Sequence, residues 1–259
     1  MTFAEPAVIR PPRRVAPATD VSYVLFHHAG GASSVFHEWH TLLADAGRVV
    51  APDLPGRRRR IRETPIRDAE RAVRDLVSLL DQQHVTPPYV LLGHSMGAVL
   101  AYELAKAWQA SGRPEPEALY VSGSRPPHLY RGEHWCAGLD DDALRAETAR
   151  WSGGSRMSVQ SSSPHQLALL RADLAVCRDY RWTPRVPLSC PVVAFTGTDD
   201  PIATTQQMRG WADYTTGPFT HRVVTGHHFF LYEPETSDHV RSALRSHSAG
   251  PRTDDGDSQ

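Results

Sequence analysis

A regular alternation of short apolar runs with amphipathic helical stretches constrains the fold of this 259-residue chain more than any other feature. Strands that alternate with helices along a chain form a parallel sheet with helices on both faces. The sequence therefore predicts an α/β fold with a mostly parallel central sheet. We expect strands at residues 22–26, 48–51, 89–92, 119–121, 192–195 and 220–224, and helices at 36–46, 68–82, 98–110, 205–214 and 235–246.

The alternation is interrupted once, between residues 125 and 187, where strand signals stop. Residues 140–151 and 164–180 are helical in pattern, so this segment is expected to be a helical lid inserted into one domain at 21–246. Residues 1–20 carry four prolines and no long apolar run, which predicts a disordered leader and not a secretory signal. Residues 247–259 are rich in Ser, Gly and Asp and are expected to form a disordered tail.

Composition excludes several classes of protein. Lys and Arg total 28 against 29 Asp and Glu, which argues against a strongly basic nucleic-acid binder. No apolar run is long enough to predict a membrane span. The cysteines are Cys136, Cys177 and Cys190, scattered and without a CxxC pair, which argues against disulfides and zinc and favours the cytoplasm. We expect a cytoplasmic monomer.

The strongest motif is Gly93-His94-Ser95-Met96-Gly97, a G-x-S-x-G pattern that stands between an expected strand and an expected helix. In that context the pattern is typical of a nucleophile elbow, a tight turn that exposes the serine hydroxyl. The glycines are required because the turn leaves no room for a Cβ beside the serine backbone. Ser95 is therefore the candidate nucleophile.

A serine nucleophile needs a base and an acid that orients the base. On this type of fold they follow the serine in the order acid, then histidine, each on a loop after a later strand. Asp199 and Asp200 follow one such strand, and His227 and His228 follow the next. The residues alone leave both choices open.

Two backbone N–H groups are expected to stabilise the oxyanion of the reaction. One belongs to Met96, the residue after the nucleophile, and the other to Ala29 in the glycine loop after the first strand. No metal-ligand spacing such as H-E-x-x-H is present among the 14 histidines, so we expect neither a metal nor a cofactor. The arginine run at 57–60 fits either a contact with phosphate or an acidic protein surface, or a solvated loop.

With these motifs in place, the chain resembles the type II thioesterases of polyketide synthases and nonribosomal peptide synthetases, which are α/β-hydrolases. The resemblance extends over residues 22–243. The matching segments are the H-A-G-G block at 28–31 with Phe36 and Trp39, the P-G-R block at 55–57, the G-H-S-M-G elbow, the R-A-D segment at 171–173 with Tyr180, the D-P pair at 200–201, and H-F-F at 228–230.

The resemblance selects Asp200 as the acid and His228 as the base. It implies hydrolysis of acyl or aminoacyl groups from the phosphopantetheine arm of acyl or peptidyl carrier proteins, an editing role in antibiotic biosynthesis. It also implies a helical lid over the acyl chamber. We further expect contacts with the substrate or carrier by His28, Arg57, Leu170 and Leu174, the two leucines through a lid helix over the acyl chain. The alternatives are a general carboxylesterase, an acyltransferase or offloading enzyme with the same triad, and a silent scaffold that binds carrier proteins.

Overall fold

A six-stranded sheet forms the centre of the protein in the computed structural model, which describes residues 21–130, 136, 138–153 and 163–248. The strand order is β2-β1-β3-β4-β5-β6, and every pairing between them is parallel. This confirms the expected α/β fold. The strands are β1 (Ser22–Phe26), β2 (Arg48–Val50), β3 (Tyr89–His94), β4 (Ala118–Ser122), β5 (Val192–Gly197) and β6 (Phe219–Val224).

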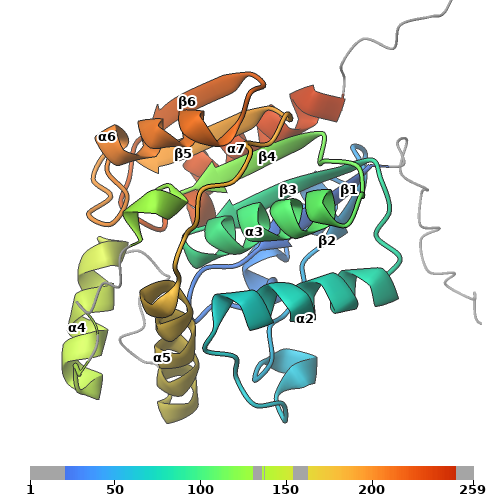
Figure 1. Ribbon diagram of the computed structural model, residues 1–259. Helices are drawn as coiled ribbons and strands as arrows, with labels where there is room; N and C mark the ends of the chain where they lie inside the picture. Colours follow the sequence, from blue (N-terminus) through green and yellow to red (C-terminus); the bar gives the residue numbers. More distant parts are fainter. Residues whose placement is uncertain (1–20, 131–135, 137, 154–162, 249–259) are drawn as a thin grey trace, which may run out of the picture.

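Helices cover both faces of the sheet, as Figure 1 shows. Helices α2 (Ala69–Gln82) and α3 (Met96–Ala110) pack on one face, while α1 (Trp39–Leu42) and α7 (Pro234–Ser248) pack on the other. Successive side chains of a strand point to opposite faces. Accordingly, Val24 of β1 joins the core under α2 and α3, whereas Tyr23 and Leu25 join the core under α1 and α7.

Two expected helices are broken into shorter turns. In place of a helix over 36–46, the chain forms a 3₁₀ turn, η1 (Ser33–Phe36), and then the single turn of α1, and the residue before each has no side-chain capping hydrogen bond. Residues 205–214 form α6 (Thr205–Met208) and the 3₁₀ helix η4 (Arg209–Tyr214). A 3₁₀ turn also places residues i and i+3 on one face, so Trp211 and Tyr214 stay buried although the α-helical prediction was wrong there.

The helical insertion consists of α4 (Asp141–Ser152) and α5 (Pro164–Asp179), which lie together below the sheet in Figure 1. Both follow β4 and precede β5, as expected. Asp140 caps α4, and Ser163 caps α5 through a capping box with Gln166. Leu144, Leu167 and Leu170 form a small apolar cluster between the two helices.

The domain boundaries predicted near the two ends of the chain are mostly untested, because the structure describes few residues beyond them. The expected disordered leader, residues 1–20, lies outside the described residues, as does the tail from residue 249. Helix α7 continues to Ser248, two residues beyond the expected end of the domain. Within the described part of the chain, every helix is too short or too polar to cross a bilayer.

Candidate active site

Ser95 lies in a strained turn between β3 and α3. Its backbone has φ 55° and ψ −122°, a combination that L-residues rarely adopt. A Cβ on Gly93 would lie 2.1 Å from the carbonyl oxygen of Gly97, and a Cβ on Gly97 would lie 2.2 Å from that of Phe26. Both glycines are therefore needed for the turn. The Ser95 N–H donates to the Ser122 carbonyl at 2.8 Å, which fixes the turn to β4.

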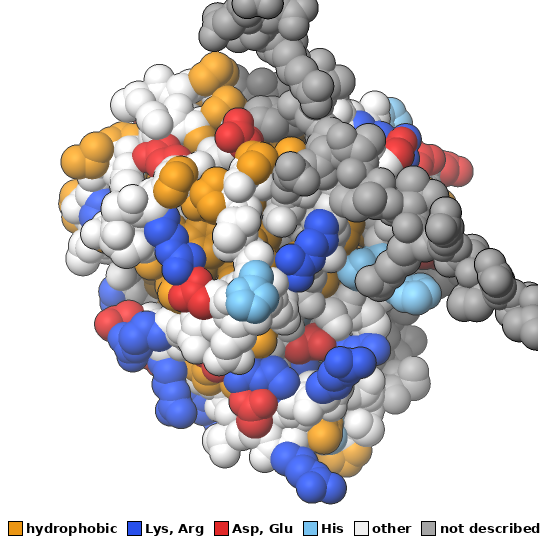
Figure 2. Space-filling model, turned by 90° about the vertical axis from the view of Figure 1, so that its right-hand side faces the viewer, with side chains coloured by type: hydrophobic (Ala, Val, Ile, Leu, Met, Phe, Trp, Pro, Cys, Tyr) orange, Lys and Arg blue, Asp and Glu red, His pale blue; other side chains and the backbone are white. Residues whose placement is uncertain are grey.

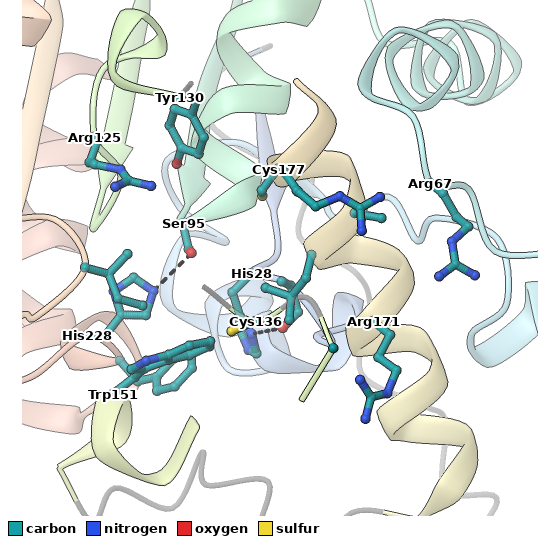
Figure 3. Close-up of a pocket in the computed structure, with 17 residues that line it drawn as sticks. His28, Arg67, Ser95, Arg125, Tyr130, Cys136, Trp151, Arg171, Cys177 and His228 are labelled. Atoms are coloured by element: carbon teal, nitrogen blue, oxygen red, sulfur yellow. Dashed lines mark hydrogen bonds between the residues drawn. The ribbon is translucent and has the colours of Figure 1, made fainter. Parts of the chain in front are cut away.

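Ser95, His228 and Asp200 form a continuous hydrogen-bonded chain. The Ser95 Oγ lies 3.0 Å from His228 Nε2 (Figure 3). His228 Nδ1 lies 2.9 Å from Asp200 Oδ2 and 3.1 Å from Oδ1. The His228 and Asp200 side chains are 2% and 0% exposed, so this pair is shielded from water. The arrangement lets His228 accept the Ser95 proton while Asp200 holds the ring in place.

The structure separates each candidate from its sequence neighbour. Asp200 Oδ1 accepts the N–H groups of Ile202 at 2.8 Å and Ala203 at 3.1 Å, which fix the carboxylate. Asp199 is exposed, and its carboxylate accepts from the hydroxyl of Thr198 at 2.8 Å. Asp200 is therefore the acid that contacts the histidine.

His227 lies against the end of α4. A Cβ on Gly153, the left-handed residue that ends α4, would overlap the His227 ring. The adjacent backbone N–H of His228 donates to the Trp151 carbonyl of α4 at 3.0 Å. This hydrogen bond joins the histidine loop to the insertion, and the contact with Ser95 is made by His228.

Gly123 is a further site residue that sequence reasoning missed. It follows β4 with φ +55°, and a Cβ there would lie 2.8 Å from His94 Cε1, 3.3 Å from Asp200 Oδ2 and 3.4 Å from His228 Cε1. Any side chain at this position would crowd the acid and the base. A glycine directly after an expected strand, level with the elbow, was the available signal.

The two proposed oxyanion donors belong to elements that meet Ser95. Met96 is the first residue of α3, and the N–H groups of a first helical turn have no partner within the helix. Ala29 lines the same pocket as Ser95. The loop after Ala29 is held by Asp173 of α5, whose Oδ2 accepts the Gly30 N–H at 2.7 Å. The role of both amides as oxyanion donors remains a prediction.

Arg57 lies inside the protein, paired with Asp173. Its Nη1 and Nη2 each lie 2.9 Å from a carboxylate oxygen of Asp173, and Nη1 donates to the Gly31 carbonyl at 2.8 Å. The two side chains are 3% and 0% exposed. A residue so buried has no surface to offer a carrier protein. The expected carrier contact of Arg57 is therefore corrected to an internal tie between α5 and the loop after β1.

Three buried histidines near the site are held neutral. Burial, reinforced by the Arg57 charge, lowers the pKa of His27 to about 4. Burial lowers the pKa of His28 to about 3. Burial and the neighbouring His228 lower the pKa of His94 well below its ordinary value, and the His94 Nδ1 lies 2.9 Å from the Ser122 hydroxyl. These rings therefore act as uncharged packing and hydrogen-bonding groups at neutral pH.

A pocket of about 200 Å³ opens in front of Ser95 (Figure 3). His28 and Leu174 line it, as expected, but Leu170 does not, because its side chain packs against Gly30 and in the cluster between α4 and α5. Sequence reasoning missed other lining residues. They include Arg67, Arg125, Tyr130, Cys136, Trp151, Arg171, Cys177, Arg178 and Phe229.

The pocket was also compared with two other chemistries, a cysteine nucleophile and a metal site. Burial raises the pKa of Cys136 to about 12, so its thiol is protonated and a poor nucleophile. Among the described residues, no three His, Cys, Asp or Glu side chains gather as metal ligands would. The serine is the group that has a base within hydrogen-bond distance.

Comparison with known proteins places this geometry in context. A model of the thioesterase domain family matches residues 23–247. A Streptomyces griseus protein described as a probable cadicidin biosynthesis thioesterase is 34% identical over 260 residues, covering 97% of this chain and 70% of that protein. The gramicidin S biosynthesis protein GrsT of Aneurinibacillus migulanus is 32% identical over 208 residues, covering 80% of this chain and 81% of GrsT.

Solved structures agree with the sequence matches. The RedJ thioesterase from the prodiginine pathway of Streptomyces coelicolor superposes with a TM-score of 0.81 and 41% identity, covering 95% of this chain and 97% of RedJ. The type II thioesterase BorB from the borrelidin biosynthetic cluster superposes with a TM-score of 0.81 and 33% identity, covering 90% of this chain and 94% of BorB.

Proposed function

We propose, from the premise that this chain belongs to the thioesterase domain family, that it removes acyl groups from the phosphopantetheine arm of carrier proteins. The predicted resemblance to type II thioesterases is confirmed, and the chain is a thioesterase of that type. A further similar structure, the type II thioesterase YbtT, is described as coming from the yersiniabactin NRPS/PKS biosynthetic pathway, which supports a role in a pathway of that kind. The role we propose there is editing, the release of stalled or wrongly loaded acyl groups.

The proposed reaction begins with attack of the Ser95 Oγ on the thioester carbonyl. His228 Nε2 takes the serine proton, and Asp200 stabilises the charged ring. The oxyanion accepts hydrogen bonds from the N–H groups of Met96 and Ala29, and a well-placed donor of this kind is worth on the order of 3 kcal/mol. When the tetrahedral intermediate collapses, the C–S bond breaks, His228 returns the proton to the departing thiolate, and the acyl group stays on Ser95 as an ester.

The second half-reaction uses the same groups. Water attacks the ester carbonyl while His228 takes one of its protons. The C–Oγ bond then breaks, His228 protonates Ser95, and the free acid leaves. The observation that carries this proposal is the 3.0 Å contact between Ser95 Oγ and His228 Nε2, with Asp200 2.9 Å behind the ring.

Three alternative functions remain. Two of them would form the same acyl-enzyme and differ in the leaving group or in the molecule that accepts the acyl group, and the third involves no reaction. A general carboxylesterase would hydrolyse small esters as well as carrier-bound thioesters. An acyltransferase or offloading enzyme would pass the acyl group to an alcohol or amine and would release little free acid. A silent scaffold would bind a carrier without turning it over.

Intact-mass analysis of a carrier protein distinguishes these functions. A butyryl-loaded carrier is incubated with wild type and with Ser95→Ala, beside butyryl-pantetheine and ethyl butyrate. The proposal predicts rapid conversion to the free-thiol carrier and butyric acid by wild type alone, with far slower ester hydrolysis. Equal turnover of ethyl butyrate would favour the esterase. Thiol release without butyric acid would favour acyl transfer, and no release at all would favour the scaffold.

A further inference from the structure

Eight of the chain's arginines lie between residues 57 and 74, against three acidic residues in the same segment. The segment comprises the 3₁₀ helix η2 (Arg58–Arg60), the loop that follows it and the first turns of α2. The whole chain has a net charge of −1, so this positive charge is local. We propose that the exposed part of this segment docks an acidic face of the carrier protein that presents the substrate.

Internal ion pairs account for only some of these arginines. Arg57 is buried against Asp173. Arg60 binds Asp75 at 2.6 Å and Glu63 at 2.5 Å, and also donates to the Asp53 carbonyl. Arg74 pairs with Glu70 on the surface of α2. These ion pairs hold the loop and the first turns of α2 in place. They use Arg57, Arg60 and Arg74, and the other arginines of the segment take no part in them.

The remaining arginines form what we call the basic face. Arg58 is 54% exposed and lies 3.9 Å from Asp53, at the limit of an ion pair. The others are all exposed and have no ion-pair partner among the described residues; they are Arg59, Arg62, Arg67 and Arg71. In Figure 2, Lys and Arg side chains gather on the lower half of the face that carries η2 and α2. Unpaired surface charge of one sign attracts and orients a partner of the opposite sign.

An exposed apolar residue lies within the basic face. Ile61 is 50% exposed and stands between the exposed Arg59 and Arg62. Among the described residues, the other large apolar side chains with high exposure are Val186 and Val223, both distant in the sequence. An apolar contact surrounded by charge is the usual composition of a protein–protein interface and offers nothing to a small solute. This favours a protein partner over free phosphate.

The basic face adjoins the entrance to the pocket. Arg67 belongs to the face and also lines the pocket in front of Ser95. The loop packs on α5 through Gly56, whose carbonyl lies 3.0 Å from His165 Nε2 and whose Cα faces the Leu169 side chain. A carrier bound here would stand at the edge of the insertion with its arm directed toward Ser95. This position links the face to thioester delivery, and in that respect the inference rests on the proposed function.

Charge reversal tests the docking surface without touching the pocket. Arg59→Glu/Arg62→Glu is compared with Arg209→Glu/Arg222→Glu, a matched pair of exposed arginines near the opposite edge of the sheet. For each protein, kcat/KM is measured with a butyryl-loaded acyl carrier domain and with butyryl-pantetheine. We expect the basic-face variant to lose about ten-fold or more with the carrier and less than about two-fold with butyryl-pantetheine. Ile61→Ser is expected to show a smaller loss of the same selectivity.

Binding provides the second measurement. The butyryl-loaded carrier is titrated calorimetrically into the Ser95→Ala protein. The titration is then repeated with Ser95→Ala proteins that also carry either the basic-face pair or the control pair of substitutions, each at low and at high NaCl. We expect binding that weakens with salt and with Arg59→Glu/Arg62→Glu, and not with the control pair, because screening acts on exposed charges. Retained binding by the basic-face variant would overturn the proposal, as would equal losses with carrier and butyryl-pantetheine, or equal losses in the control.

The two proposals fail in different ways. If wild type hydrolyses neither substrate while the basic face still governs carrier binding, the proposed function is wrong and the docking surface stands. If wild type hydrolyses both substrates while charge reversal leaves the carrier reaction unchanged, the docking surface is wrong and the function stands. If the basic-face arginines instead govern binding to phosphatidylserine vesicles and not to the carrier, the partner is a lipid surface and the docking proposal is wrong.

Discussion

The carboxyl edge of the sheet and the α4–α5 insertion hold the active site in different ways. At the sheet edge, Ser95 follows its strand directly, and Asp200 and His228 lie on short loops after theirs, fixed by backbone hydrogen bonds. The insertion has its own small apolar cluster, joins the main core through Val176 of α5, and is tied to the loops of the site by a few polar contacts. One tie is Asp173 to Arg57 and Gly30, and another is the Trp151 carbonyl to the His228 N–H. The comparison indicates that the sheet assembles the chemistry, while the insertion shapes access and secures two loops.

The largest expected effect is on the sheet edge. Asp200→Asn should lower kcat by about 10³-fold or more, because the amide cannot hold the ring of His228 in the working tautomer. Asp199→Asn, an adjacent change at an exposed carboxylate, should leave kcat within about two-fold, as expected of an ordinary surface site. Steady-state kinetics on butyryl-pantetheine measures both. Equal losses would contradict the assignment of Asp200.

The next largest effect concerns the tie between the two regions. Asp173→Asn leaves the buried Arg57 charge without its carboxylate, which should reduce the free energy of unfolding by about 3–5 kcal/mol. It should also lower kcat, because the Gly30 N–H loses a charged acceptor beside Ala29. The exposed ion pair between Arg74 and Glu70 offers the control, because Glu70→Gln should reduce the free energy of unfolding by about 0.5 kcal/mol or less. Urea unfolding measures both values, and similar costs would show that Asp173 is not a structural tie.

Gly123→Ala separates backbone strain from crowding of the site. A non-glycine residue with left-handed backbone costs about 1–2 kcal/mol, and here the added methyl group would also press on the acid and base. Gly112→Ala is the matched control, because it has φ +75° and nothing within 4 Å of the new Cβ. Both variants should lose stability in thermal unfolding through the left-handed backbone, Gly123→Ala the more because its methyl group also meets His94, and only Gly123→Ala should lose kcat. Full activity in Gly123→Ala would contradict the placement of this residue.

The smallest effect is a dependence of stability on pH. His28 has a folded-state pKa of about 3, below its unfolded value, so the unfolded state binds more protons. Its contribution is therefore present above pH 6.5 and is lost as pH falls from there toward 3. From pH 6.5 to 5.5 wild type should lose about 1 kcal/mol more than His28→Gln. Urea titrations at the two pH values test this, and parallel losses would show that His28 does not couple to folding.

Sequence reasoning predicted the sheet edge better than the insertion. Ser95, Asp200 and His228 each carry a short local motif, so their place after a strand was readable from the residues and from the resemblance. The ion pair between Arg57 and Asp173 could not be predicted from the sequence, because Asp173 lies 116 residues later, on α5, and no local pattern links the two positions. Leu170 looked like a pocket residue because helix periodicity shows an apolar face without showing what that face meets. The prediction of single helices at 36–46 and 205–214 was wrong for a related reason, because apolar residues spaced i, i+3 fit a 3₁₀ turn as well as an α-helix.

We expect Ser95, at the sheet edge, to carry the acyl group during thioester hydrolysis. Rapid acid quench of wild type with butyryl-loaded carrier, followed by peptide mass mapping, tests it directly. We expect a butyryl increment during the first turnover on the peptide that contains Ser95, and none in Ser95→Ala. Hydrolysis that proceeds in Ser95→Ala, or an increment carried by Cys177 or Cys136, would contradict the account.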